Sequence, residues 1–141
     1  MGVAYRCDHG LGCTFVVFEG ALTPESRADA ERTLLADAAF PPGPAVLLDI
    51  AAVTDTFTFT PAVVSEIAAG WRALAAELGP IKIAMVTSAL WKQAHQFSLE
   101  VEGSGVRVIV FTNGDSAASW LGLDPASARS ILQELSTEAE S

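Results

Sequence analysis

Few side chains in this sequence have the type and spacing that chemistry requires. Cys7, His9 and Cys13, near the N-terminus, are residue types that bind soft metal ions. Because alternate residues of a strand point to opposite sides, we interpret them instead as two reduced thiols and a histidine in a turn. His95 is expected on the solvent side of a helix.

The sequence lacks the usual catalytic and nucleotide-binding signatures. No serine has glycines two residues before and two residues after it, so no nucleophile elbow is present. Gly10-Leu11-Gly12 lies between two strand-like segments, whereas a nucleotide-binding loop lies between a strand and a helix. We therefore expect a non-enzymatic protein without a metal or another cofactor.

Asp49 is the carboxylate of greatest interest. It stands near the end of the apolar segment 45–50, which predicts a strand covered on both faces. A charge in such a place requires a hydrogen-bonding partner or a backbone group to cap. Because no second acid or base is visibly paired with Asp49, a loop-stabilising role is favoured over catalysis.

The threonine-rich segment 51–60 is predicted to be a loop at the carboxyl end of this strand, where open α/β sheets place their sites. Phe57 and Phe59 alternate with threonines, so an extended segment would place both rings on one side. They either fill the core or form an exposed patch, and their polar neighbours favour the patch slightly. We predict an interaction loop that includes Asp49, Thr54, Asp55, Phe57, Thr58 and Phe59, with neighbouring Ser88 and Asn113.

The elements that must position these residues alternate along the chain. Strands are expected at residues 3–7, 13–19, 45–50, 81–87 and 106–111. Helices are expected from Pro24 to about Ala38, from Pro61 to about Leu78, over 88–101, after a cap at Asp115, and from Pro125. This pattern predicts an α/β fold, with a mixed sheet, an N-terminal antiparallel hairpin and helices packed on the sheet.

Length and composition indicate one domain. The chain has 141 residues, of which we assign 1–135 to the domain and 136–141 to a frayed polar tail. Its formal net charge of -9 argues against nucleic acid or an anionic membrane as a partner. With no apolar stretch long enough to span a membrane and no signal peptide, we expect a cytoplasmic protein.

Four stretches, in their order along the chain, resemble the SpoIIAA-like branch of the STAS domains, the bacterial anti-sigma-factor antagonist fold. The first is Phe18-Glu19-Gly20-Ala21-Leu22-Thr23, which enters the first helix. The second is Val46-Leu47-Leu48-Asp49-Ile50, followed by Val53. The third is Ile83-Ala84-Met85-Val86, before Val110-Phe111, and the last runs from Phe111 through Ala117-Ala118-Ser119-Trp120-Leu121.

The resemblance implies a regulatory module that switches between protein partners. In that family a serine after the central strand is phosphorylated, and the aligned position here is Thr58, although the family's Asp-Ser-Ser-Gly stretch is absent. The family is also similar to a lipid-transfer fold, which implies a carrier or sensor of a small apolar ligand as the alternative. Trp71, Trp91, Phe57 and Phe59 could line its pocket.

We therefore expect a STAS-like interaction module with a protein partner, or a binding protein for a lipid-like ligand between helix and sheet. Exposed aromatic residues favour self-association, whereas the net charge of -9 opposes it. The expected assembly is a monomer or a weak homodimer.

Overall fold

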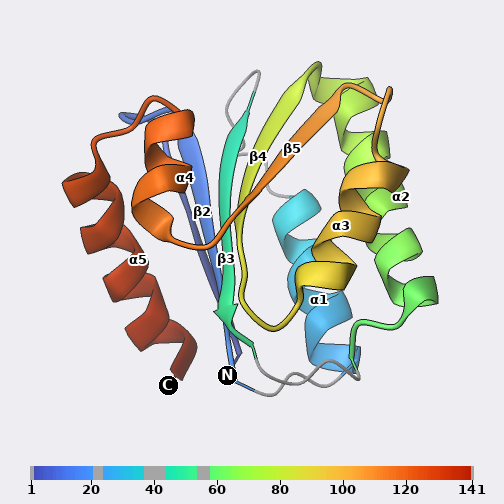
Figure 1. Ribbon diagram of the computed structural model, residues 1–141, viewed down its shortest axis with the longest axis horizontal. Helices are drawn as coiled ribbons and strands as arrows, with labels where there is room; N and C mark the ends of the chain where they lie inside the picture. Colours follow the sequence, from blue (N-terminus) through green and yellow to red (C-terminus); the bar gives the residue numbers. More distant parts are fainter. Residues whose placement is uncertain (1, 21–23, 37–43, 54–57, 141) are drawn as a thin grey trace.

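The computed structural model describes residues 2–20, 24–36, 44–53 and 58–140. Within these ranges the chain alternates strands and helices, as Figure 1 shows. In chain order the elements are β1 (Val3–Asp8), β2 (Cys13–Glu19), α1 (Pro24–Leu35), β3 (Ala45–Ala52), α2 (Pro61–Leu78), β4 (Ile81–Val86), α3 (Trp91–Glu100), β5 (Val106–Phe111), α4 (Gly114–Trp120) and α5 (Pro125–Glu140).

The five strands form one mixed sheet in the order β1-β2-β3-β4-β5. β1 and β2 pair antiparallel, and each later neighbour pairs in parallel. The α/β class, the N-terminal antiparallel hairpin and the mixed sheet are therefore confirmed. The apolar strand β3 lies in the middle of the sheet, where both its faces are covered.

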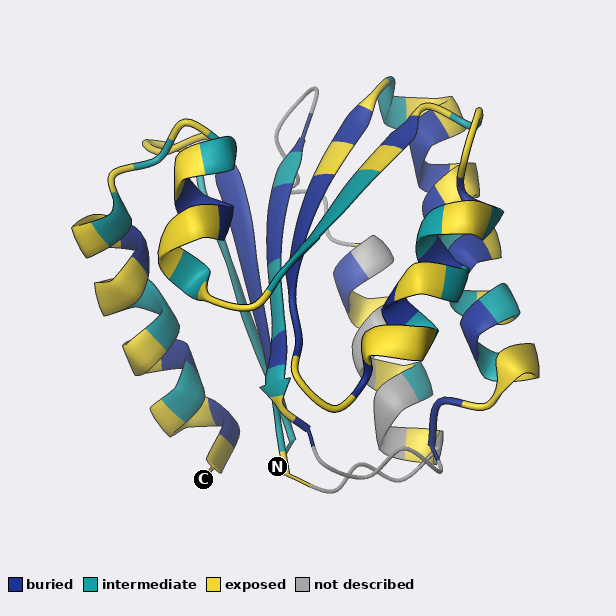
Figure 2. Cartoon of the chain, viewed as in Figure 1, coloured by how far each residue is buried: buried dark blue, intermediate teal, exposed yellow. Residues whose placement is uncertain are grey.

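Helices cover both faces of the sheet in three layers. α1, α2 and α3 lie on one face, and α4 and α5 lie on the other (Figure 1). We call the buried residues on the α1–α3 face the first core and those on the α4–α5 face the second core. Because successive strand residues point to opposite faces, Val46 and Ile50 lie in the first core and Leu47 lies in the second. Figure 2 shows the result, with buried residues along the sheet and on the inner sides of the helices.

α2 has clear signals at both ends. The Thr60 hydroxyl accepts a hydrogen bond from the Val63 amide at 3.3 Å, and Pro61 occupies the first turn, where no donor is lost. Gly79 ends the helix with φ of 87°, a conformation that glycine adopts without a steric penalty. Trp71 and Leu74 on its inner side are buried in the first core.

Two expected helix starts are wrong by a few residues. α3 begins at Trp91 rather than at residue 88, because the Thr87 hydroxyl accepts from the Leu90 amide at 3.2 Å and holds a turn there. α4 is capped by Asn113 rather than Asp115, since the Asn113 side-chain oxygen accepts from the Ser116 amide at 2.8 Å.

The end of the chain also differs from the expectation. α5 does not fray after Leu135 but continues to Glu140, and Ala139 is buried. The Ser136 hydroxyl donates a hydrogen bond to the Glu19 carboxylate at the end of β2. The last helical turn is therefore attached to the sheet. Among the described residues, no helix is long and apolar enough to cross a membrane.

Candidate functional site

An apolar cavity of about 70 Å³ lies between the sheet and the helices α1, α2 and α3. Its floor is a row of residues paired across four strands, Tyr5, Val16, Leu48 and Met85. The row shares one face because the strands pair in register at these positions. Its other lining residues are Val3, Phe18, Leu34, Ile50, Phe59, Val64, Ile67, Trp71, Leu90, Gln93, Ala94 and Phe97.

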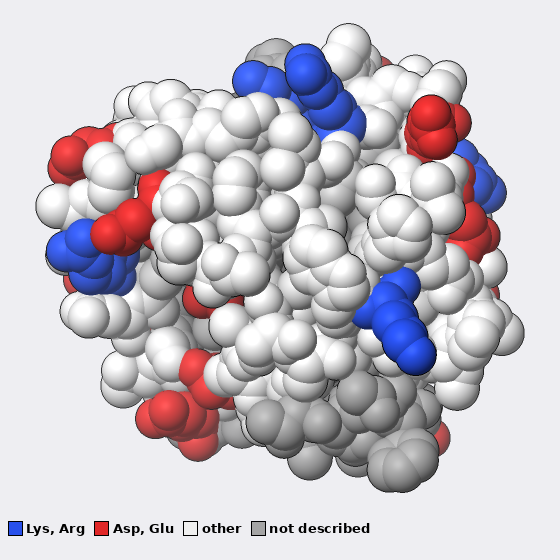
Figure 3. Space-filling view, in the orientation of Figure 1, with Lys and Arg blue, Asp and Glu red and all other residues white. Residues whose placement is uncertain are grey.

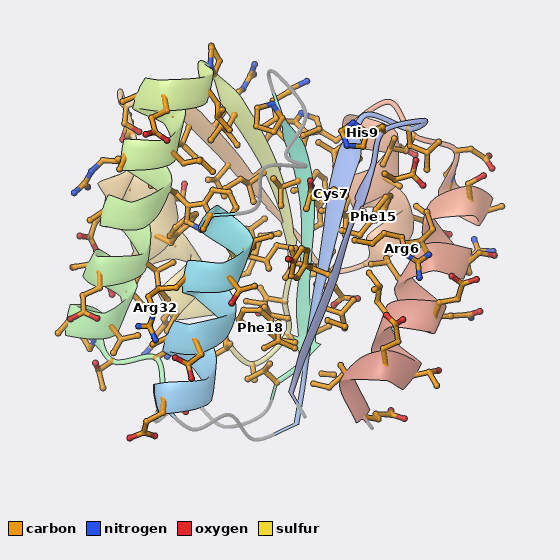
Figure 4. The ribbon with its side chains drawn as sticks, turned by 180° about the vertical axis from the view of Figure 1, so that it is seen from behind. Arg6, Cys7, His9, Phe15, Phe18 and Arg32 are labelled. Carbon is orange, nitrogen blue, oxygen red and sulfur yellow. The ribbon has the colours of Figure 1, made fainter. Side chains whose placement is uncertain are left out.

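Three of the aromatic side chains that line this cavity come from different parts of the fold. Phe18 and Phe59 stack with their ring centroids 6.5 Å apart, and Trp71 is buried on α2. Figure 4 shows Phe18 on the α1 side of the sheet and Phe15 on the α5 side, as expected for strand residues an odd number of positions apart. Phe59 enters from the loop that precedes α2.

Hydrogen-bonding groups are scarce in the lining. The side chains of Tyr5, Trp71 and Gln93 supply them, and Tyr5 and Trp71 already have interaction partners. The Gln93 amide is half-buried and forms no side-chain hydrogen bond to any residue that the structure describes. Water in this cavity would find few partners, because a buried water molecule typically makes about three hydrogen bonds.

For Phe59, the structure corrects the expectation of an exposed aromatic patch. Phe59 is only 7% exposed and belongs to the first core. Thr58 beside it is 6% exposed, so two successive residues are buried and the strict alternation fails. Burial also keeps the Thr58 hydroxyl from the surface in this conformation, where a kinase would need it. Thr54, Asp55 and Phe57 lie outside the described residues.

Ser88 and Asn113 have structural partners of their own. The Ser88 hydroxyl donates to the Ala51 carbonyl at 3.1 Å and joins the loop after β4 to the end of β3. Asn113 caps α4, on the other face of the sheet from Phe59. The predicted interaction loop is therefore divided between the two faces. Trp91, expected in a ligand pocket, is 54% exposed and does not line the cavity.

Asp49 occupies a different recess, on the α4–α5 side of β3. This recess has a volume of about 290 Å³ and is also lined by Asp115, Arg129 and Ser136. The Asp49 carboxylate accepts from the Ala51 amide at 3.0 Å, and because both residues lie in β3 this contact is within the strand rather than in the expected loop. Burial raises the pKa of Asp49, and the nearby charge of Glu19 adds to the effect, while the Ala51 amide lowers it.

The two cysteines lie on neighbouring strands without forming a disulfide bond. The Thr14 hydroxyl donates to Cys7 Sγ at 3.5 Å, whereas Cys13 is buried in the second core, on the opposite face. Burial raises the pKa of the Cys13 thiol to about 12, so it stays protonated and unreactive at neutral pH. No cluster of three metal-binding side chains occurs in the described ranges.

Sequence reasoning missed Tyr5, Phe18 and Gln93 as cavity residues. Each lies in a segment with an ordinary strand or helix pattern, so no local signal distinguishes it. The available signal was positional, because Gln93 is one turn before the core residue Phe97 on a mostly polar helix.

A scan against protein-family models found no matching family, and searches among curated proteins and solved structures found no match.

Proposed function

We propose that this protein is a non-enzymatic binding module that holds a small apolar molecule in the cavity between the sheet and α1–α3. The observation that carries the proposal is the cavity itself, about 70 Å³ of unfilled space among apolar side chains. An unfilled cavity costs about 24 cal/mol per Å³, so this one costs about 2 kcal/mol of stability. A bound molecule would recover the lost contacts.

The lining defines the chemistry of the ligand. The cavity is about half the ~150 Å³ of an apolar cavity that accepts benzene, so a ring-sized ligand requires one side chain to move. Phe59 is suited to this movement because it is carried by a loop rather than by a strand or helix. The Gln93 amide favours a ligand with one hydrogen-bonding group at the α3 side.

Titration with phenol, followed by NMR, tests this function. We expect phenol to shift the signals of residues around the cavity, such as Leu48, Trp71 and Phe97. Ala94→Leu adds apolar volume to the lining and should abolish the shifts. Ala69→Leu adds the same volume on the exposed side of α2 and should leave them unchanged. If phenol shifts no cavity signals in the parent protein, the proposal is wrong.

A second candidate function is a cytoplasmic, STAS-like regulatory module that binds a protein partner at the carboxyl edge of the sheet. The bond from Ser88 to Ala51 favours it, because it joins the loop after β4 to the end of β3 at this edge. Photocrosslinking from position 88 in a cell extract should give one discrete adduct. The same crosslinker at the exposed Ser130 on α5 is the control. Identical adducts from both positions would reject this function.

A further inference from the structure

The sheet ends at β5, whose outer edge faces no other described strand. Among the described elements, β5 pairs with β4 alone, and Figure 1 shows no other labelled helix or strand in front of it. The Gly105 and Phe111 carbonyls accept from the Ile81 and Thr87 amides of the β4 side. Backbone groups of a strand alternate in direction, so those of residues 106, 108 and 110 point away from β4.

The composition of β5 suits pairing with another strand. Five of its six residues, in the sequence VRVIVF, are apolar, and Arg107 is the single charge. Edge strands that must avoid association usually have several charges, a proline or a bulge. β5 has a regular register with β4 and contains no proline. Its free edge is therefore a template for strand addition.

The outer side of α3 adds an apolar surface beside this edge. Arg72 of α2 donates to the Glu100 carbonyl at 2.8 Å, and Gln96 donates to the Pro61 carbonyl at 3.0 Å. This side of α3 therefore faces α2. Trp91 lies about 180° around the helix from Glu100, so its side chain leaves α3 on the side away from α2, and α3 itself packs on β5. Trp91 is 54% exposed and Leu99 is 56% exposed.

Charge also distinguishes this face from the rest of the molecule. The chain has 17 acidic residues and 8 basic ones, but β5 contains no acidic residue. Figure 3 shows that the middle of this face is mostly uncharged. Lys92 and Glu102 lie near opposite ends of α3, and neither has an ion-pair partner among the described residues. Two copies of α3 side by side and antiparallel would bring opposite charges together.

We propose that a second copy of this chain binds at the β5 edge. The two β5 strands pair antiparallel around a two-fold axis, and the sheet becomes continuous across both copies. On the α1–α3 face, the axis places the two α3 helices next to each other. Trp91 of each copy then covers the Leu99 end of the other copy's α3. The interface does not include the cavity, so the dimer can be tested separately from ligand binding.

Sedimentation of the full chain over about 5–500 µM tests this interface at concentrations suited to a weak dimer. We expect a reversible monomer–dimer equilibrium for the parent. Val108→Pro removes an outward-pointing amide while leaving the bonds to β4, and should weaken the dimer at least about tenfold. Val108→Thr keeps that amide and should still dimerise.

A helix variant keeps the test decisive if Val108→Pro fails to fold. Trp91→Glu changes an exposed side chain and should also weaken the dimer at least about tenfold, whereas Ala126→Glu adds the same charge on exposed α5 and should not. A parent that stays monomeric throughout overturns the proposal, including the case in which β5 accepts a strand from a different protein. A dimer that survives Trp91→Glu and any folded Val108→Pro also overturns it.

Discussion

Phe59 lines the cavity and is carried by a loop. Its replacement therefore tests the packing of this one side chain without changing a strand or a helix. Phe59→Ala should destabilise the protein by about 3–5 kcal/mol, because a buried ring and its stack on Phe18 are lost. Urea unfolding measures the change. Trp91→Ala is the matched aromatic control, and its exposed position predicts a much smaller loss. Equal losses for the two variants would contradict this placement of Phe59.

Asp49 should make stability fall as pH rises. Its folded pKa is raised by burial, so the folded protein binds a proton more tightly than the unfolded chain does. Parent stability relative to Asp49→Asn should therefore be highest below the ordinary pKa of about 3.9 and decline through the raised pKa. Urea unfolding of both proteins over that range tests this. A parent that gains stability over Asp49→Asn with rising pH would show that the carboxylate is favourable.

Single residues also show where the sequence alone was sufficient. The apolar run 45–50 correctly indicated that the Asp49 carboxylate has a hydrogen-bonding partner, although that partner, the Ala51 amide, lies in the same strand and not in a loop. The burial of Phe59 could not be predicted, because alternation with threonine is compatible with rings that point into the core and with rings that point to solvent. The choice depends on Phe18, which is distant in sequence and meets Phe59 only in the fold.

At the scale of elements, the role of Asn113 as the N-cap of α4 can be tested by substitution. Asn113→Ala should destabilise the protein by about 1 kcal/mol, since the Ser116 amide loses its acceptor at the start of α4. Asn113→Ser retains a capping oxygen and should recover most of the loss. Thermal unfolding compares the three proteins. If alanine is as stable as asparagine, the side chain has no capping role.

Elements were predicted well where the local sequence carries a strong signal, such as a continuous apolar run or a proline or glycine at a helix end. The continuous apolar runs of β3 and β4 and the proline and glycine ends of α2 determine these elements locally. The starts of α3 and α4 were displaced because Thr87 and Asn113 are polar residues whose capping bonds depend on the exact backbone turn. The last turn of α5 was missed because its sequence is mostly polar and Ala139, which is 1% exposed, is its one buried residue among those described.

For the whole molecule, the net charge predicts how the β5 dimer responds to salt. Each copy has a formal charge of -9, so the two copies repel each other across their full surfaces. Raising the ionic strength from about 0.05 to 0.5 M shortens the screening length and should tighten the dimer several-fold. Sedimentation at the two salt concentrations measures this. A weaker dimer at high salt would mean that pairs such as Lys92 with Glu102 dominate the association.

The cavity between the sheet and α1–α3 can be examined directly with xenon, which is apolar and small enough for the unmodified site. In crystals of the parent under xenon pressure, we expect an atom in contact with Leu48, Trp71 and Phe97, at about 4 Å from their carbon atoms. Crystals of Ala94→Leu should lack it. Absence of xenon from the parent cavity, or equal occupancy in both crystals, would contradict a binding site at this position.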